Sequence, residues 1–183
     1  MDLLPVFLKL GGRRVLVVGG GPVAASKLDA LRHAGADVTV VAPQVHASIR
    51  AAGVRVLERP FITADLDGVW LAVAAATPAV NAEVSREAEA RRIFVNAVDD
   101  PPNASAYLGG VIRRAGVTIA ISTSGEAPAL AGVLREGIDA LLPADLERWS
   151  TCARSLRAGW KAAAVPMAQR RPLLIEALKG LYP

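Results

Sequence analysis

The sequence predicts an α/β fold in which a doubly wound parallel sheet is followed by a small α+β region and a helical C-terminal region. Three observations predict this class. Short apolar runs of strand type alternate with helical patterns over residues 13–99. Two strand-like runs then follow each other across a short turn, and the rest of the chain has a helical pattern. Strands that alternate with helices are typical of a parallel sheet with right-handed crossovers.

The expected elements of the first region follow this alternation along the chain. The run at residues 69–76 is continuously apolar, as central parallel strands are. Two longer segments place apolar residues at helical spacing and predict amphipathic helices. The expected strands are residues 13–18, 38–42, 54–57, 69–76 and 92–98, and the expected helices are residues 23–33 and 79–91.

The pattern changes after the fifth expected strand. Residues 107–113 and 117–122 predict two strands joined as a hairpin by residues 114–116. A helix is expected from about residue 127 to 142, and the remaining chain is expected to be helical with interruptions at Pro143, Pro166 and Pro172. We therefore predict a Rossmann-like domain at residues 1–112, a small α+β region at 113–143 and a helical region at 144–183.

Three consecutive glycines follow the first expected strand and open the first expected helix. The spacing Gly19-x-Gly21-x-x-Ala24 matches the dinucleotide fingerprint. Glycine lacks a Cβ atom, so the backbone can turn sharply and a pyrophosphate can approach it closely. A tight strand–helix turn without a ligand is the alternative. The expected cofactor-binding residues are Gly19, Gly20, Gly21, Pro22, Val23, Pro43 and Gln44.

The end of the second expected strand bears on the choice of dinucleotide. A Rossmann fold usually carries an acidic residue there, which binds the ribose hydroxyls. This chain has Pro43 and Gln44 instead, and the glutamine amide can still hydrogen-bond a ribose. No arginine occupies the turn, although Arg50 lies nearby in the sequence, so NAD is favoured over NADP.

Two adjacent carboxylates follow the fifth expected strand. Ligands of open α/β sheets bind beyond the carboxyl ends of the strands, so Asp99 and Asp100 stand where chemistry is expected. One of them can serve as a general base. The alternative is a plain turn, because Asp-Asp-Pro-Pro is favourable turn composition.

Composition and charge narrow the class of protein. Hydrophobic residues make up 52% of the 183 residues and charged residues 21%, which indicates a folded chain. The one cysteine, the lack of a basic start and the lack of a long apolar run predict a cytoplasmic protein without a disulfide or membrane span.

The net charge of +4 lies entirely in residues 104–183, with 10 basic and 6 acidic residues. A basic surface of this kind can attract a nucleic acid, a membrane or a polyanionic small molecule, and a plain solvated surface is the alternative. Nucleic acid is the least favoured of the three partners, because aromatics and basic blocks are few.

Several segments together resemble the precorrin-2 dehydrogenase module of siroheme synthases. The resemblance runs in order over residues 1–143 and more loosely through the helical tail. One G-x-G-x-x-A motif is a weak signal, but five motifs at matching intervals are specific. The matching segments are residues 1–7, 17–24, 40–43, 95–99, and 120–131 with 134–136.

The resemblance implies an NAD-dependent oxidation of precorrin-2 to sirohydrochlorin and, in some members, the insertion of ferrous iron to give siroheme. It implies that Asp99 is the key catalytic residue for both steps. Precorrin-2 carries eight carboxylates, which would give the basic second region a role in substrate binding. Members of the family are homodimers built through the second region, so a homodimer is expected. The expected protein is the dehydrogenase module as a stand-alone chain, without the methyltransferase domain of the larger enzyme.

The segment Ser122–Pro128 leaves a strand and enters a helix, with Ser124 as the expected cap. Such a helix start favours an anion, here a substrate carboxylate, although a plain N-cap is the alternative. The position that matches Thr123 is a serine that can be phosphorylated in some relatives, and the sequence leaves this open for threonine. The expected substrate-binding residues are Ser122, Thr123, Ser124, Arg113, Arg114 and Arg135.

The chain departs from the family pattern in two places. Residues 105–110 read Ser-Ala-Tyr-Leu-Gly-Gly where Ser-Phe-Ile-x-Pro is expected, and residues 78–79 lack the two acidic residues that often follow the fourth strand. No histidine follows His46, so iron insertion has less support than dehydrogenation, and no metal-ligand set is predicted. Two other functions stay open: a non-catalytic tetrapyrrole- or NAD-binding regulator, and a dehydrogenase for another small acid.

Overall fold

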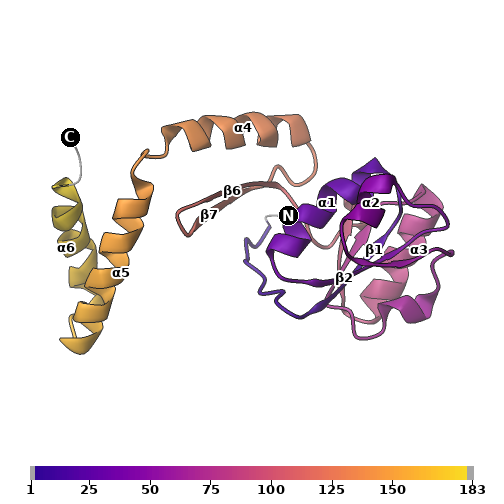
Figure 1. Ribbon diagram of the computed structural model, residues 1–183, viewed down its shortest axis with the longest axis horizontal. Helices are drawn as coiled ribbons and strands as arrows, with labels where there is room; N and C mark the ends of the chain where they lie inside the picture. The colour runs from indigo at the N-terminus through magenta and orange to yellow at the C-terminus, as the bar shows by residue number, and fades with distance from the viewer. Residues whose placement is uncertain (1–2, 181–183) are drawn as a thin grey trace. The chain divides into compact units, whose positions relative to one another are not determined.

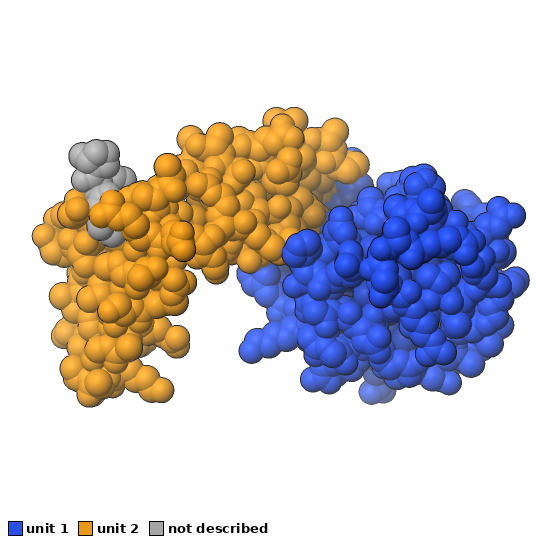
Figure 2. All heavy atoms as spheres, viewed as in Figure 1, with its two compact units in different colours: residues 1–108, 124–126 blue, residues 109–123, 127–183 orange. Residues whose placement is uncertain are grey.

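The computed structural model describes residues 3–180. The chain forms two compact units, shown by ribbon in Figure 1 and by colour in Figure 2. The first unit extends to Leu108 and also includes Ser124–Glu126; the second comprises Gly109–Thr123 and the chain from Ala127 onward. The division into residues 1–112, 113–143 and 144–183 stays a prediction.

The first unit contains the predicted parallel sheet. Its strands are β1 (Arg14–Val18), β2 (Asp37–Val41), β3 (Arg55–Leu57), β4 (Leu71–Ala74) and β5 (Phe94–Ala97). They pair in the order β3-β2-β1-β4-β5, and every pair is parallel. The chain order therefore reverses between β1 and β4, which is the switch point where open α/β sheets bind ligands. The predicted Rossmann-like fold class is confirmed.

The helices of this unit cover both faces of the sheet (Figure 1). Successive residues of β1 point to opposite faces: Val15 and Val17 pack against α1 (Pro22–His33), and Leu16 and Val18 belong to the core beneath α3 (Pro78–Ala90). Helix α1 buries its residues at positions i, i+4 and i+7, as an amphipathic helix does. Three short elements were not predicted: the helix α2 (Ala47–Ala51) and the 3₁₀ turns η1 (Thr63–Leu66) and η2 (Pro101–Asn103).

The second unit begins with the predicted hairpin. Strands β6 (Gly110–Arg114) and β7 (Val117–Ile121) are antiparallel and are joined across residues 115–116. Helices α4 (Pro128–Leu141), α5 (Leu146–Ala162) and α6 (Met167–Lys179) follow. The helical structure is interrupted before α5 at Pro143 and before α6 at Pro166, as predicted. The expected interruption at Pro172 is wrong. This proline lies inside α6, because losing one backbone donor does not end a helix whose other residues continue it.

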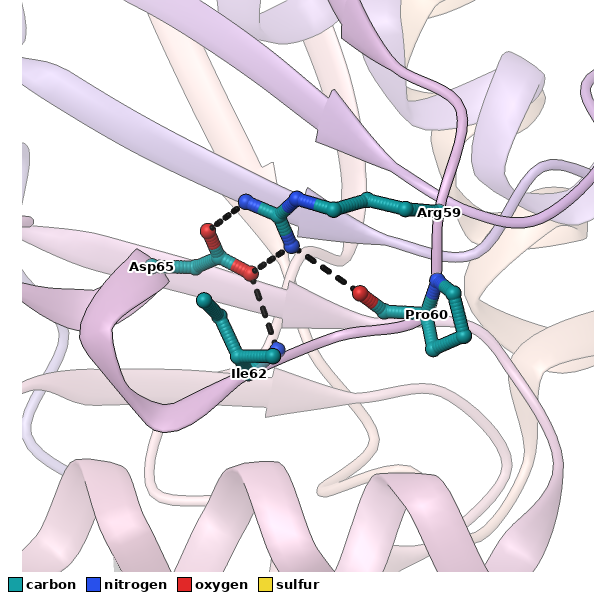
Figure 3. Close-up of polar contacts among 4 residues, drawn as sticks. All are labelled: Arg59, Pro60, Ile62 and Asp65. Carbon is teal, nitrogen blue, oxygen red and sulfur yellow. Dashed lines mark hydrogen bonds and ion pairs between the residues drawn. The ribbon is translucent and has the colours of Figure 1, made fainter.

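An ion pair fastens the segment between β3 and β4 (Figure 3). The Arg59 guanidinium donates two hydrogen bonds to the Asp65 carboxylate, at 2.8 and 2.5 Å, and a third to the Pro60 carbonyl. The backbone N–H of Ile62 donates to the same carboxylate at 3.0 Å. The hydrogen bond from Arg59 is the largest cause that lowers the pKa of Asp65; burial opposes it and the Ile62 bond adds to it. The Asp65 side chain is only 8% exposed, so this carboxylate depends on its partners.

We expect the substitution Asp65→Asn to lower the melting temperature by roughly 2–4 °C at neutral pH. The folded pKa of Asp65 lies below its unfolded value, so its contribution is fully present above about pH 4 and is lost as the pH falls through the folded pKa. The difference between the parent chain and the variant should therefore shrink in acid. Thermal melts between pH 3 and 7 measure this.

The matched control is Glu58→Gln. Glu58 forms the same kind of pair with Arg50, but its side chain is 44% exposed, and exposed pairs contribute little. Equal losses for both variants would mean that burial adds nothing to the Arg59–Asp65 pair.

Candidate functional site

Backbone pairing brings the expected site segments to one edge of the sheet. The N–H of Gly19 donates to Val41 at the end of β2, and the N–H of Ala75 donates to Val18 at the end of β1. The N–H of Val98 donates to Ala74 at the end of β4. The glycine turn, the segment Pro43–Gln44 and Asp99 therefore all follow carboxyl ends of neighbouring parallel strands, as the sequence predicts.

The three glycines differ in what surrounds them. A Cβ atom at Gly19 would overlap the carbonyl of Ala75, and one at Gly20 would overlap the carbonyl of Gln44. Gly19 also has φ +127°, a conformation that side chains rarely adopt. A Cβ atom at Gly21 would have no neighbour within 4 Å. Gly19 and Gly20 are therefore needed by the fold itself, whereas Gly21 faces the space that a ligand can enter.

The residues around Gly21 suit an anionic cofactor. Gly21 is the N-cap of α1 and supplies no side-chain cap for the first turn of the helix. Pro22 and Val23 begin this helix, and Val23 is 45% exposed. Where open space lies in front of a helix start, the free N–H groups of the first turn can bind a pyrophosphate. Gln44 is exposed beyond β2, where a ribose would lie if this turn holds a dinucleotide.

The two adjacent carboxylates have different surroundings. The Asp100 carboxylate accepts a hydrogen bond from the Asn103 amide at 2.8 Å, and its carbonyl accepts from the Asn103 N–H, so Asp100 shapes the turn η2. Within residues 3–180, the carboxylate of Asp99 has no hydrogen bond or ion pair. Asp99 is exposed and has φ +56°, a left-handed conformation that is uncommon outside glycine and that is often found at functional sites. The geometry thus singles out Asp99 as the available carboxylate.

The expected substrate segment is only partly as predicted. The side chain that reaches the start of α4 is Thr123, whose hydroxyl accepts a hydrogen bond from the Ala127 N–H at 3.3 Å. Ala127 is the N-cap, so the expectation that Ser124 caps α4 is wrong. Ser124 instead has φ +56°, and the bend that this creates carries Ser124–Glu126 into the first unit. The role of Ser122, Thr123 and Ser124 in substrate binding stays a prediction.

The three candidate arginines also differ. Arg114 donates to the carbonyls of Asp139 and Pro143, at 2.9 and 3.1 Å, and so holds the end of α4. Arg135 pairs with its neighbour Glu136. Arg113 is exposed on β6 and makes no hydrogen bond or ion pair within the described part of the chain. Arg113 is therefore the most available of the three for a carboxylate.

One buried polar side chain of this region was not predicted. Asn96 of β5 is 7% exposed, and its amide donates to the carbonyl of Ala106 at 3.0 Å. Its signal in the sequence is a polar residue within an apolar strand, which implies a specific hydrogen bond.

Other kinds of site find little support in residues 3–180. They contain no group of three or more histidine, cysteine or acidic residues that could hold a metal ion. None of the described helices is long and apolar enough to cross a membrane. A small cavity of about 170 Å³ is lined by Arg14, Arg55, Arg59 and Asp65, among others. None of the residues that line this cavity belongs to the glycine turn, to Pro43–Gln44 or to the segment that carries Asp99.

Comparisons with known proteins agree with this geometry. A family model described as "Putative NAD(P)-binding" matches residues 6–110. The siroheme synthase of Azotobacter vinelandii is 40% identical over 98% of the chain, and siroheme synthase 1 of Serratia proteamaculans is 42% identical over 100% of the chain. The chain spans about two fifths of the length of these curated relatives, 40% and 39%. A solved structure of SirC, a precorrin-2 dehydrogenase, is 29% identical, with a TM-score of 0.73 over 95% of this chain and 88% of SirC.

These matches cover the glycine turn and the expected catalytic carboxylate, and they extend through the second unit. The resemblance to precorrin-2 dehydrogenases and siroheme synthases that the motifs predict is therefore confirmed. The chain belongs to the NAD(P)-binding family whose model spans its glycine turn and its parallel sheet.

Proposed function

We propose that the protein is an NAD-dependent precorrin-2 dehydrogenase that forms sirohydrochlorin in siroheme biosynthesis. The observation that carries this proposal is the pairing of an open glycine turn with an available carboxylate at one edge of the sheet. The likeness to SirC over nearly all of both chains supports the substrate class. An anaerobic assay that follows NADH formation from precorrin-2 tests it, and binding without turnover would instead support the non-catalytic regulator.

Dehydrogenation removes a hydride and a proton from the macrocycle. NAD, when bound at Gly19–Gly21, supplies the hydride acceptor. Asp99 then takes the proton, because its carboxylate is exposed and not engaged by another described residue. Arg50 forms an ion pair with Glu58, whose hydrogen bond raises the pKa of Arg50. A guanidinium held in this way is not offered to a 2′-phosphate, which supports NAD over NADP.

The basic residues of the second unit suit a substrate with several carboxylates. Arginine binds a carboxylate through charge-assisted hydrogen bonds. We assign this role first to Arg113 and then to Arg135, whereas Arg114 serves mainly to hold α4. The insertion of ferrous iron stays a prediction, and phosphorylation of Thr123 stays open.

We further propose that the protein is a homodimer that uses the second unit. Few apolar residues of this unit are buried within the described chain; they are Ile112, Ala131 and Leu146. Helix α4 leaves Leu130, Val133, Leu134 and Leu141 between 42% and 83% exposed. Exposed apolar patches mark contact surfaces, and a second copy would cover these residues.

Placing a carboxylate at Gly21 should prevent cofactor binding without unfolding the protein. We expect Gly21→Asp to weaken NAD binding by at least about tenfold, since the new charge would face the pyrophosphate. Because the space around Gly21 is open, the melting temperature should change little. Titration calorimetry with NAD measures the affinity. Gly20→Ala is the contrasting variant, since its methyl group would overlap the Gln44 carbonyl and should destabilise the fold.

Removing the Asp99 carboxylate should abolish turnover. We expect Asp99→Ala and Asp99→Asn to reduce kcat by roughly 100-fold or more while NAD affinity stays unchanged. Asparagine tolerates φ +56° better than alanine does, so Asp99→Asn separates the lost base from backbone strain. Asp100→Asn keeps a side-chain oxygen that can accept the hydrogen bond from Asn103, so kcat should fall less than in the Asp99 variants. Near-normal turnover by Asp99→Asn would leave Asp99 as a turn residue only.

A charge on the exposed face of α4 should prevent dimerisation. Val133 is 66% exposed in the single chain, and we expect Val133→Asp to shift the protein from twice the chain's mass to the monomer mass. Sedimentation equilibrium measures this. The control is Gln169→Glu, which adds the same charge at an exposed polar position of α6. A parent protein that sediments as a monomer would overturn the dimer.

A further inference from the structure

The loop that carries Asp99 is closed at its base by hydrogen bonds to β5. The N–H groups of Ser105 and Ala106 both donate to the Val95 carbonyl at 2.9 Å, and the Val95 N–H donates to the Ser105 hydroxyl at 2.8 Å. The Asn96 amide adds its bond to Ala106. The chain therefore leaves β5 at one end of the loop and returns to it at the other, and residues 97–104 are held between these points.

The residue after this closure contacts a turn from a distant part of the sequence. A methyl group placed at Gly125 would lie 3.0 Å from Cε1 of Tyr107 and 3.3 Å from Cγ of Pro101. Gly125 has φ +78° and follows Ser124 at φ +56°, so the backbone bends sharply to reach this position. The Tyr107 hydroxyl also donates to the Pro101 carbonyl, at 3.4 Å. Tyr107, Pro101 and Gly125 thus form one packed group, which we call the brace.

The brace acts on the loop close to Asp99. Pro101 lies two residues after Asp99 and begins the turn η2. Asp99 holds a left-handed conformation, which aspartate adopts more readily than most side chains but which still costs energy that the contacts of its loop offset. The hydrogen bond of Asn103 to Asp100 and the contact of Tyr107 with Pro101 both hold the residues that directly follow Asp99.

We propose that Tyr107 is a positioning residue, whose ring, seated against Gly125 and Pro101, holds the Asp99 loop in its reactive conformation. This inference rests on the proposed role of Asp99 as the base. Tyr107 lies in residues 105–110, the segment that departs from the expected family pattern. A side chain at Gly125 would be strained by φ +78° and would lie tightly against the ring.

The test compares two glycine substitutions that impose the same backbone strain. Gly125→Ala adds a methyl group inside the brace, whereas Gly53→Ala adds one at φ +67° with no atom within 4 Å. We expect Gly125→Ala to lower kcat with precorrin-2 about tenfold, since small misplacements of a reacting group are costly. NAD affinity should stay unchanged, and Gly53→Ala should keep the parent kcat. If the contact at Gly125 had a purely structural role, both variants would have a lower melting temperature and their kcat values would be equal.

Variants of Tyr107 test the same contact from the other side. Tyr107→Phe keeps the ring and loses only the long hydroxyl bond, so kcat should stay within about twofold of the parent value. Tyr107→Ala should lower kcat as much as Gly125→Ala does. The double variant should lower kcat little further, because both substitutions act on one contact. Additive losses, or a kcat for Gly125→Ala equal to that for Gly53→Ala, would overturn the brace.

A second measurement does not depend on activity. Amide hydrogen exchange of residues 98–100, 103 and 104 should become faster in Gly125→Ala and Tyr107→Ala, and not in Gly53→Ala or Tyr107→Phe. Exchange that is equal in all four would contradict the inference. A parent protein that forms no NADH from precorrin-2, yet shows this exchange pattern, would contradict the proposed function and leave the brace intact.

Discussion

Two backbone contacts at the glycine turn set the arrangement of the site. Gly19 and Gly20 pass so close to the carbonyls of Ala75 and Gln44 that no side chain fits at either position. This close approach joins the end of β1 to the ends of β4 and β2, and it aims the start of α1 at open space in front of Gly21. A larger residue would push these strand ends apart and move the helix start, because the obstructing atoms are backbone and cannot rotate away.

The proposed catalytic edge combines a hydrogen-bonded turn with one available carboxylate. Asp100 and Asn103 hydrogen-bond to each other and shape the loop, whereas Asp99 keeps its carboxylate exposed. Two neighbouring aspartates thus have separate tasks, one in folding and one in the proposed chemistry. The left-handed backbone of Asp99 costs energy that the surrounding hydrogen bonds offset.

The second unit is organised on a different principle. It has few buried apolar residues within the described chain, and its ordered contacts are polar, such as the bonds of Arg114 to the end of α4. A unit of this kind gains stability when a partner covers its apolar surface. The exposed leucines and valine of α4 provide that surface, which is why we place the dimer contact there.

The sequence by itself determined the order of strands and helices, the glycine turn and the carboxylates after β5, because these depend on local periodicity and on residues whose backbone needs are specific. It did not reveal that Pro172 lies within a helix, that Ala127 is the N-cap of α4 and donates to the Thr123 hydroxyl, or that Arg114 is engaged. It also did not reveal that Asp100, and not Asp99, is hydrogen-bonded to Asn103 in the turn η2. Only the tertiary structure decided these points, since each depends on which atoms from distant segments come within hydrogen-bonding or packing distance.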